Sequence, residues 1–192
     1  MKMKACSQLF ALIFLPLLLA FSVGAQSRDH LTPKEVELVQ DAQVLDQRID
    51  VFVKAMERRM IIITGIQPAQ ASHSNKPSKD ADKWGELPKG TRAELIDDVA
   101  RILEESITNI DDVSMHDEKN PLLAKALRQL AASATQIANQ LTPIREQARS
   151  AEELSSLEQA LENAQSIVDA AKKLPPPSEA EKSKGKPKKP KG

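Results

Sequence analysis

Apolar residues recur at alternating spacings of four and three between residues 38 and 56, and this heptad seam constrains the fold more than any other feature. Its members are Leu38, Ala42, Leu45, Ile49, Phe52 and Met56. Such a repeat keeps the apolar side chains on the one face of a helix that packs against a partner helix. Thr32 and Glu35 form a capping box around Pro33, and Gly65 suits the opposite end. The pattern predicts one long helix over residues 33–64.

Three further helices are predicted by the same combination of caps and apolar periodicity. A second capping box at Thr91 opens an amphipathic helix over 91–112, with a polar connection to follow. A proline in the first turn opens a helix over 121–148. A third capping box, at Ser150 and Glu153, opens a helix over 151–173. The apolar seam of this last helix is one residue out of phase with its predecessor, which predicts a break between the two.

Pro143 lies inside the third of these segments and leaves two interpretations open. The apolar register continues through it, which favours a continuous but kinked helix. A proline in a helix removes a hydrogen bond and normally bends or ends the helix. Thr142 and Pro143 would then act as a cap and a fresh start.

Together these patterns predict an all-α protein, an antiparallel bundle of three to four helices with a long first helix. The bundle domain is expected over residues 26–174. Residues 67–90 are rich in Ser, Lys, Pro and Asp and predict a flexible loop. Residues 175–192 are rich in Lys and Pro and predict a disordered tail.

Residues 1–25 have the order of a secretory signal peptide. Lys2 and Lys4 precede a short apolar run, and small residues precede the expected cleavage site before Gln26. The run is shorter than the roughly 20 residues of a membrane span. We therefore expect an exported protein, periplasmic or secreted, with no transmembrane segment after cleavage. Cleavage removes Cys6, the sole cysteine. It also moves the formal charge from 0 to −2, and this charge does not favour binding to nucleic acid.

No catalytic, cofactor-binding or metal-binding pattern is recognisable, and we expect a protein that is not an enzyme and needs no cofactor. The nearest approach to a metal site is His116, which lies among Asp111, Asp112, Asp117 and Glu118. Their spacing matches no calcium loop, because the glycine turn and the closing glutamate are missing. An exposed acidic helix end explains the cluster more simply.

Three features are candidates for an interaction surface. The first is an apolar stretch near the end of the long helix, where the heptad register drifts, comprising Met56, Met60, Ile61, Ile62 and Ile63. Its alternative role is core, covered by the 67–90 loop.

The other two are Trp84, as a loop anchor or a recognition residue, and the lysines of the tail. These lysines are Lys182, Lys184, Lys186, Lys188, Lys189 and Lys191. The partners expected are other proteins or anionic envelope polymers, and a homodimer stays open.

Leu31 and Thr32 open the segment 31–35, and Leu141 and Thr142 open the similar segment 141–145. The two sites resemble the Leu-Thr-x-x-Gln pair of bacterial envelope-stress chaperones, with Glu35 and Arg145 in place of glutamine. That resemblance implies a helical hairpin dimer that holds unfolded clients. Residues 31–35 together with 41–43 also resemble uncharacterised secreted bacterial helical proteins.

The sequence therefore favours a non-enzymatic structural or protein-interaction role in the cell envelope. A holdase-like periplasmic chaperone is the alternative.

Overall fold

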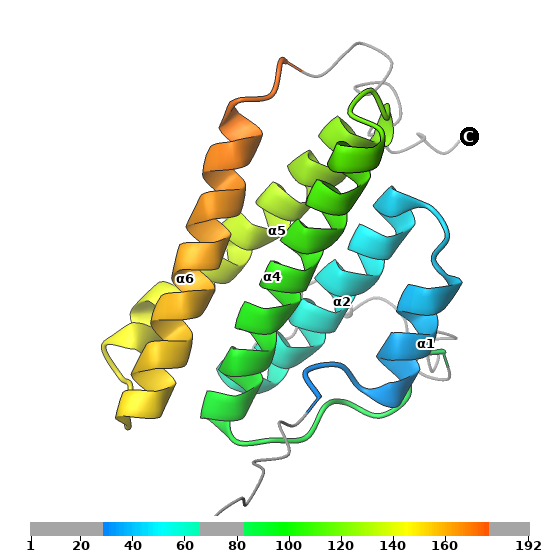
Figure 1. The fold of residues 1–192 in the computed structure, drawn as a ribbon. Helices are drawn as coiled ribbons and strands as arrows, with labels where there is room; N and C mark the ends of the chain where they lie inside the picture. The colour runs from blue at the N-terminus through cyan, green and yellow to red at the C-terminus, as the bar shows by residue number, and fades with distance from the viewer. Residues whose placement is uncertain (1–28, 66–82, 177–192) are drawn as a thin grey trace, which may run out of the picture.

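The computed structural model describes residues 29–65 and 83–176, which fold into five helices without a strand (Figure 1). The helices are α1 (Pro33–Asp41), α2 (Leu45–Thr64), α4 (Arg92–His116), α5 (Leu122–Arg145) and α6 (Ala151–Lys172). The prediction of an all-helical bundle is confirmed. Residues 1–25, predicted to be a signal peptide, most of the predicted loop over 67–90, and the tail lysines lie outside the described residues.

Helices α2, α4, α6 and α5 form the bundle, and α1 lies against its outer side next to α2 (Figure 1). Consecutive helices run in opposite directions, yet two pairs of neighbours are parallel. Near their first turns α4 and α6 are joined by Arg92 and Glu153, and further along Asn163 donates to the carbonyl of Ala100. Asp46 and Lys125 likewise join the first turns of α2 and α5, so these two helices are also parallel. The bundle is therefore not antiparallel throughout.

The predicted helix over 33–64 is wrong in one respect, because the chain folds back at residues 42–44. Neither glycine nor proline occurs there. Instead, Arg48 Nε donates to the carbonyl of Ala42 at 3.2 Å, and another Arg48 nitrogen donates to Asn109 at 3.0 Å. The first bond satisfies a carbonyl that a continuous helix would have paired internally, and the second connects α2 to α4. The heptad seam still predicts burial correctly, since its side chains face the interior on both sides of the break.

Two predicted capping boxes are confirmed with both of their reciprocal hydrogen bonds, at Thr32 and at Thr91. Gly65 also ends α2 in the left-handed region, with φ of 69°. The box predicted at Ser150 is only half present. Ser150 accepts from the backbone of Glu153, but the Glu153 carboxylate accepts from Arg149 instead of returning to Ser150.

Two predicted boundaries need correction. Helix α4 continues to His116, so residues predicted as a polar connection form its last turn. Helix α5 ends at Arg145, although its predicted continuity through Pro143 is confirmed. The alternative of a fresh start at Thr142 is wrong, because the Thr142 hydroxyl donates back to the carbonyl of Ala138 within the same helix.

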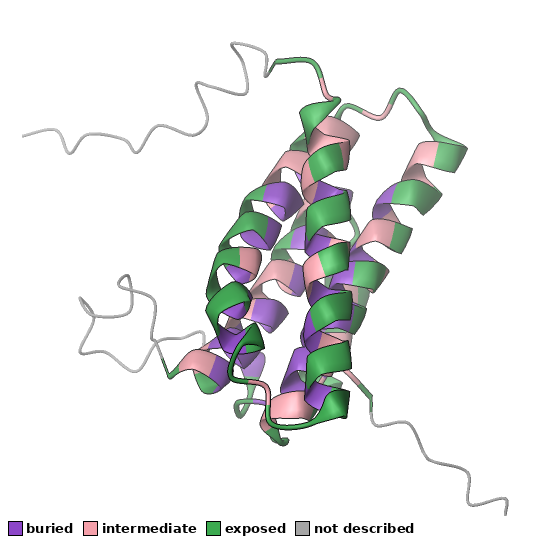
Figure 2. Cartoon of the chain, turned by 90° about the vertical axis from the view of Figure 1, so that its left-hand side faces the viewer, coloured by how far each residue is buried: buried purple, intermediate pink, exposed green. Residues whose placement is uncertain are grey.

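The core is almost entirely aliphatic, and each bundle helix turns its buried face inward (Figure 2). Phe52, the only phenylalanine among the described residues, is fully buried in it. No helix among the described residues is long and apolar enough to cross a membrane.

Candidate functional site

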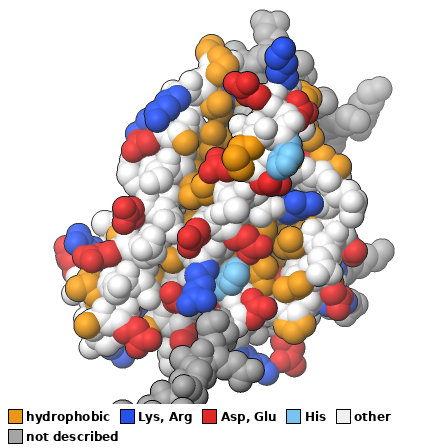
Figure 3. All heavy atoms as spheres, viewed as in Figure 1, with side chains coloured by type: hydrophobic (Ala, Val, Ile, Leu, Met, Phe, Trp, Pro, Cys, Tyr) orange, Lys and Arg blue, Asp and Glu red, His pale blue; other side chains and the backbone are white. Residues whose placement is uncertain are grey.

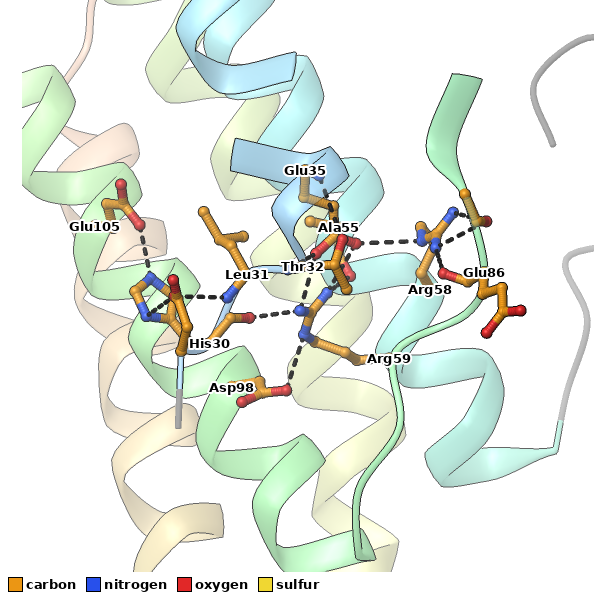
Figure 4. A network of polar contacts seen from close by, with 12 residues as sticks. His30, Leu31, Thr32, Glu35, Ala55, Arg58, Arg59, Glu86, Asp98 and Glu105 are labelled. Carbon is orange, nitrogen blue, oxygen red and sulfur yellow. Dashed lines mark hydrogen bonds and ion pairs between the residues drawn. The ribbon is translucent and has the colours of Figure 1, made fainter. Parts of the chain in front are cut away.

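The most unusual feature of the molecule is a cluster of buried charged side chains beneath α1 (Figure 4). At its centre is the carboxylate of Glu35, which has no exposed surface. One oxygen accepts from the backbone of Thr32, as the capping box requires. The same carboxylate accepts from two nitrogens of Arg59, at 3.1 and 3.0 Å. Glu35 therefore both completes the capping box of α1 and forms an ion pair with Arg59 of α2.

Arg59 is only 1% exposed and uses its whole guanidinium group. Besides Glu35, its Nε donates to Asp98 of α4 at 3.2 Å. The remaining N–H groups donate to the carbonyls of Ala55 and His30. Arginine suits this position because its planar group offers five donors in a fixed geometry. One side chain therefore ties together α1, α2, α4 and the segment before α1.

Arg58 extends the cluster to residues 84–88, which we call the strap. It donates to the carbonyls of Gly85 and Glu86, and its guanidinium lies 5.6 Å from the ring centre of Trp84. Arg58 Nε is 3.2 Å from Glu35, close enough for an ion pair but not aligned for a hydrogen bond. Burial lowers the pKa of Arg58, and the Glu35 charge opposes that shift. Arginine nevertheless stays charged near neutral pH.

His30 forms a second, more exposed attachment to α4. Its Nε2 lies 2.7 Å from the carboxylate of Glu105. This hydrogen bond raises the pKa of His30, burial of the ring opposes the rise, and the charges of Glu105, Asp29 and Asp98 add to it. The protonated ring is therefore favoured in the folded protein.

The charged cluster escaped prediction, although the seam contained the signal for it. Counted at spacings of four and three, the seam extends backward to Glu35 and Leu31 and forward to Arg59 and Ile63. All these positions are buried. The two charged members of an otherwise apolar seam, Glu35 and Arg59, pair with each other. A charged residue at a seam position is costly unless it is paired.

Trp84 is buried, at 9% exposure, and acts as the loop anchor that was one of its two predicted roles. Two hollows flank it. The first, of about 390 Å³, lies between the strap and the start of α1. The second, of about 360 Å³, lies between Trp84, the end of α1 and the first half of α2, with Asp41 and Asp50 in its wall. Both hollows are lined in part by α1 and by Trp84.

The apolar stretch proposed as an interaction surface lies mostly in the core. Met56, Met60 and Ile63 are buried, Ile61 is half-buried, and Ile62 is exposed. The alternative role as core thus describes three of the five side chains. The six tail lysines lie outside the described residues.

The acidic cluster around His116 shows no ligand arrangement. The His116 ring is exposed and contacts the carbonyl of Asp112 at 2.7 Å. Among the described residues, no group of three or more His, Cys, Asp or Glu side chains could hold a metal ion. Acidic side chains are instead spread over the outer surface of α4 and α6 (Figure 3).

One acidic side chain at the base of α6 has a defined structural task. Burial opposes ionisation of Glu153, but hydrogen bonds from the Arg149 backbone and the Arg92 side chain outweigh it and lower the pKa of Glu153. This carboxylate joins the first turns of α4 and α6.

Comparisons with known proteins find no family model, no curated protein and no solved structure that matches the chain. What can be concluded about function must therefore come from the chemistry of the residues themselves.

Proposed function

We propose that the chain is an exported, non-enzymatic protein of the cell envelope, in which an acidic helical body carries a basic tail that binds an anionic polymer or anionic lipid surface. The observation that carries this proposal is the division of charge. The described residues hold 23 acidic and 16 basic side chains, a formal charge of −7. Residues 177–192 hold six lysines and two glutamates, a formal charge of +4.

This division favours a two-part molecule over a uniformly charged one. An acidic body is repelled from anionic surfaces, whereas each lysine near such a surface contributes about 1 kcal/mol of attraction. The tail would then set which end of the molecule meets the polymer, and the body would face away from it.

The buried charged groups form contacts within the protein, which also supports a non-enzymatic role. Glu35 and Asp98 both accept hydrogen bonds from Arg59, and the three residues join α1, α2 and α4. Catalytic groups must instead be within reach of a reacting substrate. Side chains that hold α1 in place are better suited to rigidity than to chemistry.

The experiment is a binding assay with three versions of the chain: the natural sequence, a version in which the six tail lysines are glutamine, and one lacking residues 177–192. The probes are vesicles of phosphatidylcholine with and without phosphatidylglycerol, and soluble polyphosphate. We expect the natural chain alone to bind the anionic probes, with binding that weakens as salt is added. Equal binding by all three versions would contradict the proposal. Binding to polyphosphate but not to vesicles would identify a polymer and exclude a lipid surface.

The chaperone alternative is tested in the same preparation. A holdase suppresses the aggregation of a denatured client protein at equimolar ratio and binds an apolar dye while folded. We expect neither, because Leu31 is buried and Thr32 caps α1, so both residues of the first Leu-Thr site have structural tasks. Suppression that persists without the tail would favour the chaperone over the proposed function.

Export has its own test. The intact mass of the chain recovered from the envelope fraction should correspond to a protein that begins at Gln26. A mass that still includes residues 1–25 would contradict cleavage.

A further inference from the structure

We propose that α1 exchanges between two copies of the chain: residues 42–44 straighten, α1 and α2 become one helix, and each α1 occupies the α1 site of the other copy. The partner is a second copy of this protein, and Glu35 of one copy would pair with Arg59 of the other. Exchange of an identical element is a low-cost route to a dimer. This inference does not depend on the proposed function.

The first argument is that the fold-back at 42–44 is weakly specified. The heptad seam runs through these residues without a shift in register, and no glycine or proline interrupts it. Ala42 ends α1 at φ of −76°, so the helix lacks the left-handed cap that commonly ends a helix. Val44, which precedes α2, makes no side-chain capping bond and is 38% exposed. The same residues would fit the interior of a continuous helix.

The second argument is that the contacts of α1 do not depend on which copy supplies it. Glu35 binds Arg58 and Arg59 of α2, and Gly85 of the strap lies against Lys34. None of these contacts involves residues 42–44. Straightening costs the bond from Arg48 to the Ala42 carbonyl, and a continuous helix replaces it with a backbone hydrogen bond. The closed monomer and the exchanged dimer therefore contain nearly the same interactions.

The third argument is that the α1 site cannot stay empty. If α1 left without a replacement, Arg58 and Arg59 would lose the Glu35 carboxylate. Val36 and Val39, which pack against the core, would at the same time be exposed to water, and exposure of apolar surface is unfavourable. An α1 that leaves its own site must enter another, so exchange produces a dimer and not an opened monomer. Its population rises with protein concentration.

Two substitutions at one position test the hinge in opposite directions. Val44→Ala favours a continuous helix and should raise the association constant about fivefold, because both helices of the dimer gain propensity. Val44→Pro shifts φ at this residue from −106° toward the roughly −65° of proline, a modest strain in the fold-back, but it breaks a helix interior outright and should lower the constant at least about a hundredfold. Sedimentation equilibrium of the full chain over a range of concentrations measures both. Equal association by the natural chain and both variants would overturn the proposal.

A disulfide distinguishes exchange from ordinary side-by-side association. A Cβ added at Gly85 would lie 3.6 Å from the Cβ of Lys34, within the range that disulfides adopt. Gly85 has φ of 65°, so its substitution carries some backbone strain, which is the same in every hinge background compared.

The pair Lys34→Cys and Gly85→Cys is placed in the full chain with Cys6→Ser, together with Val44→Ala or Val44→Pro. After oxidation of the dimer fraction, we expect Val44→Ala to give covalently linked dimers on a denaturing gel without reductant. With Val44→Pro the crosslink should close within one chain. A crosslink confined to single chains in the dimer fraction of Val44→Ala would overturn the proposal.

Discussion

Different kinds of interaction stabilise the two sides of this bundle. On one side, α5 and α6 contribute aliphatic residues such as Leu130, Leu141 and Leu157, all fully buried. On the other, the buried charges of Glu35 and Arg59 hold α1 to α2 and α4, and Arg58 of α2 holds the strap. Apolar packing is non-directional and tolerates changes that conserve volume. A buried ion pair is directional and fails when either partner is lost.

Among substitutions that test this comparison, we expect Arg59→Met to have the largest effect on stability. The substitution keeps an unbranched but shorter side chain, and it removes the guanidinium group that both Glu35 and Asp98 bind. We expect a loss of about 3–5 kcal/mol in unfolding free energy, measured by urea denaturation. Hydrogen exchange should show lost protection in α1 and retained protection in α5.

The control for Arg59 is Arg101→Met. Arg101 pairs with Asp97 one turn away, and both side chains are nearly half exposed. Surface pairs of this kind contribute less than about 1 kcal/mol. Equal losses for the two substitutions would mean that the buried cluster is no more important than a surface pair.

The aliphatic side is tested at Leu130. Leu130→Ala should cost about 2–5 kcal/mol because it leaves a cavity. Leu130→Met conserves volume and should cost less than about 1.5 kcal/mol. Urea denaturation separates the two. A large loss with methionine would show that this core depends on shape as strictly as the charged side depends on its hydrogen bonds.

The two capping boxes provide a comparison between residues with the same local pattern. Glu35→Gln removes the charge facing two buried guanidinium groups and should cost about 2 kcal/mol. Glu94→Gln changes the equivalent residue of α4, which is exposed, and should cost less than about 0.5 kcal/mol. Thermal unfolding of both variants beside the natural chain measures the difference. Equal costs would indicate that Glu35 contributes only as a cap.

These boxes also show what the sequence can and cannot predict. Caps and periodicity are local, so the starts of α1 and α4 and the burial of the seam were predictable. The fold-back at 42–44 was not, because a seam with an unbroken register is compatible with a straight helix and with a hairpin. Within a single chain, the contact that requires the fold-back is a long-range ion pair, from Glu35 to Arg59, whose energy no local pattern contains.

The parallel pairing of α4 with α6 has the same origin. Short connections predict that consecutive helices are antiparallel, but they do not say which helices become neighbours across the bundle. The joining contacts come from residues far apart in the chain, such as Arg92 and Glu153.

The smallest effect should come from His30, where the charged side meets solvent. Its hydrogen bond with Glu105 raises the pKa of His30 above the ordinary value of 6.5. A raised pKa in the folded state means that the contact stabilises the protein fully below pH 6.5 and is lost as the pH rises through the folded-state pKa. His30→Gln should therefore destabilise the protein at about pH 5.5 and have little effect at about pH 9.

The expected size is less than about 1 kcal/mol, because the two side chains are 25% and 34% exposed and solvent screens their attraction. His116→Gln is the matched control, since that ring is 77% exposed and contacts only its own helix. Urea denaturation at the two pH values measures both variants. A loss that grows toward high pH would contradict the ion pair. It would mean that the neutral ring stabilises the protein by packing, while the His30 carbonyl, which the substitution leaves unchanged, still accepts from Arg59. The charged side of the molecule would then be held by the buried arginines alone.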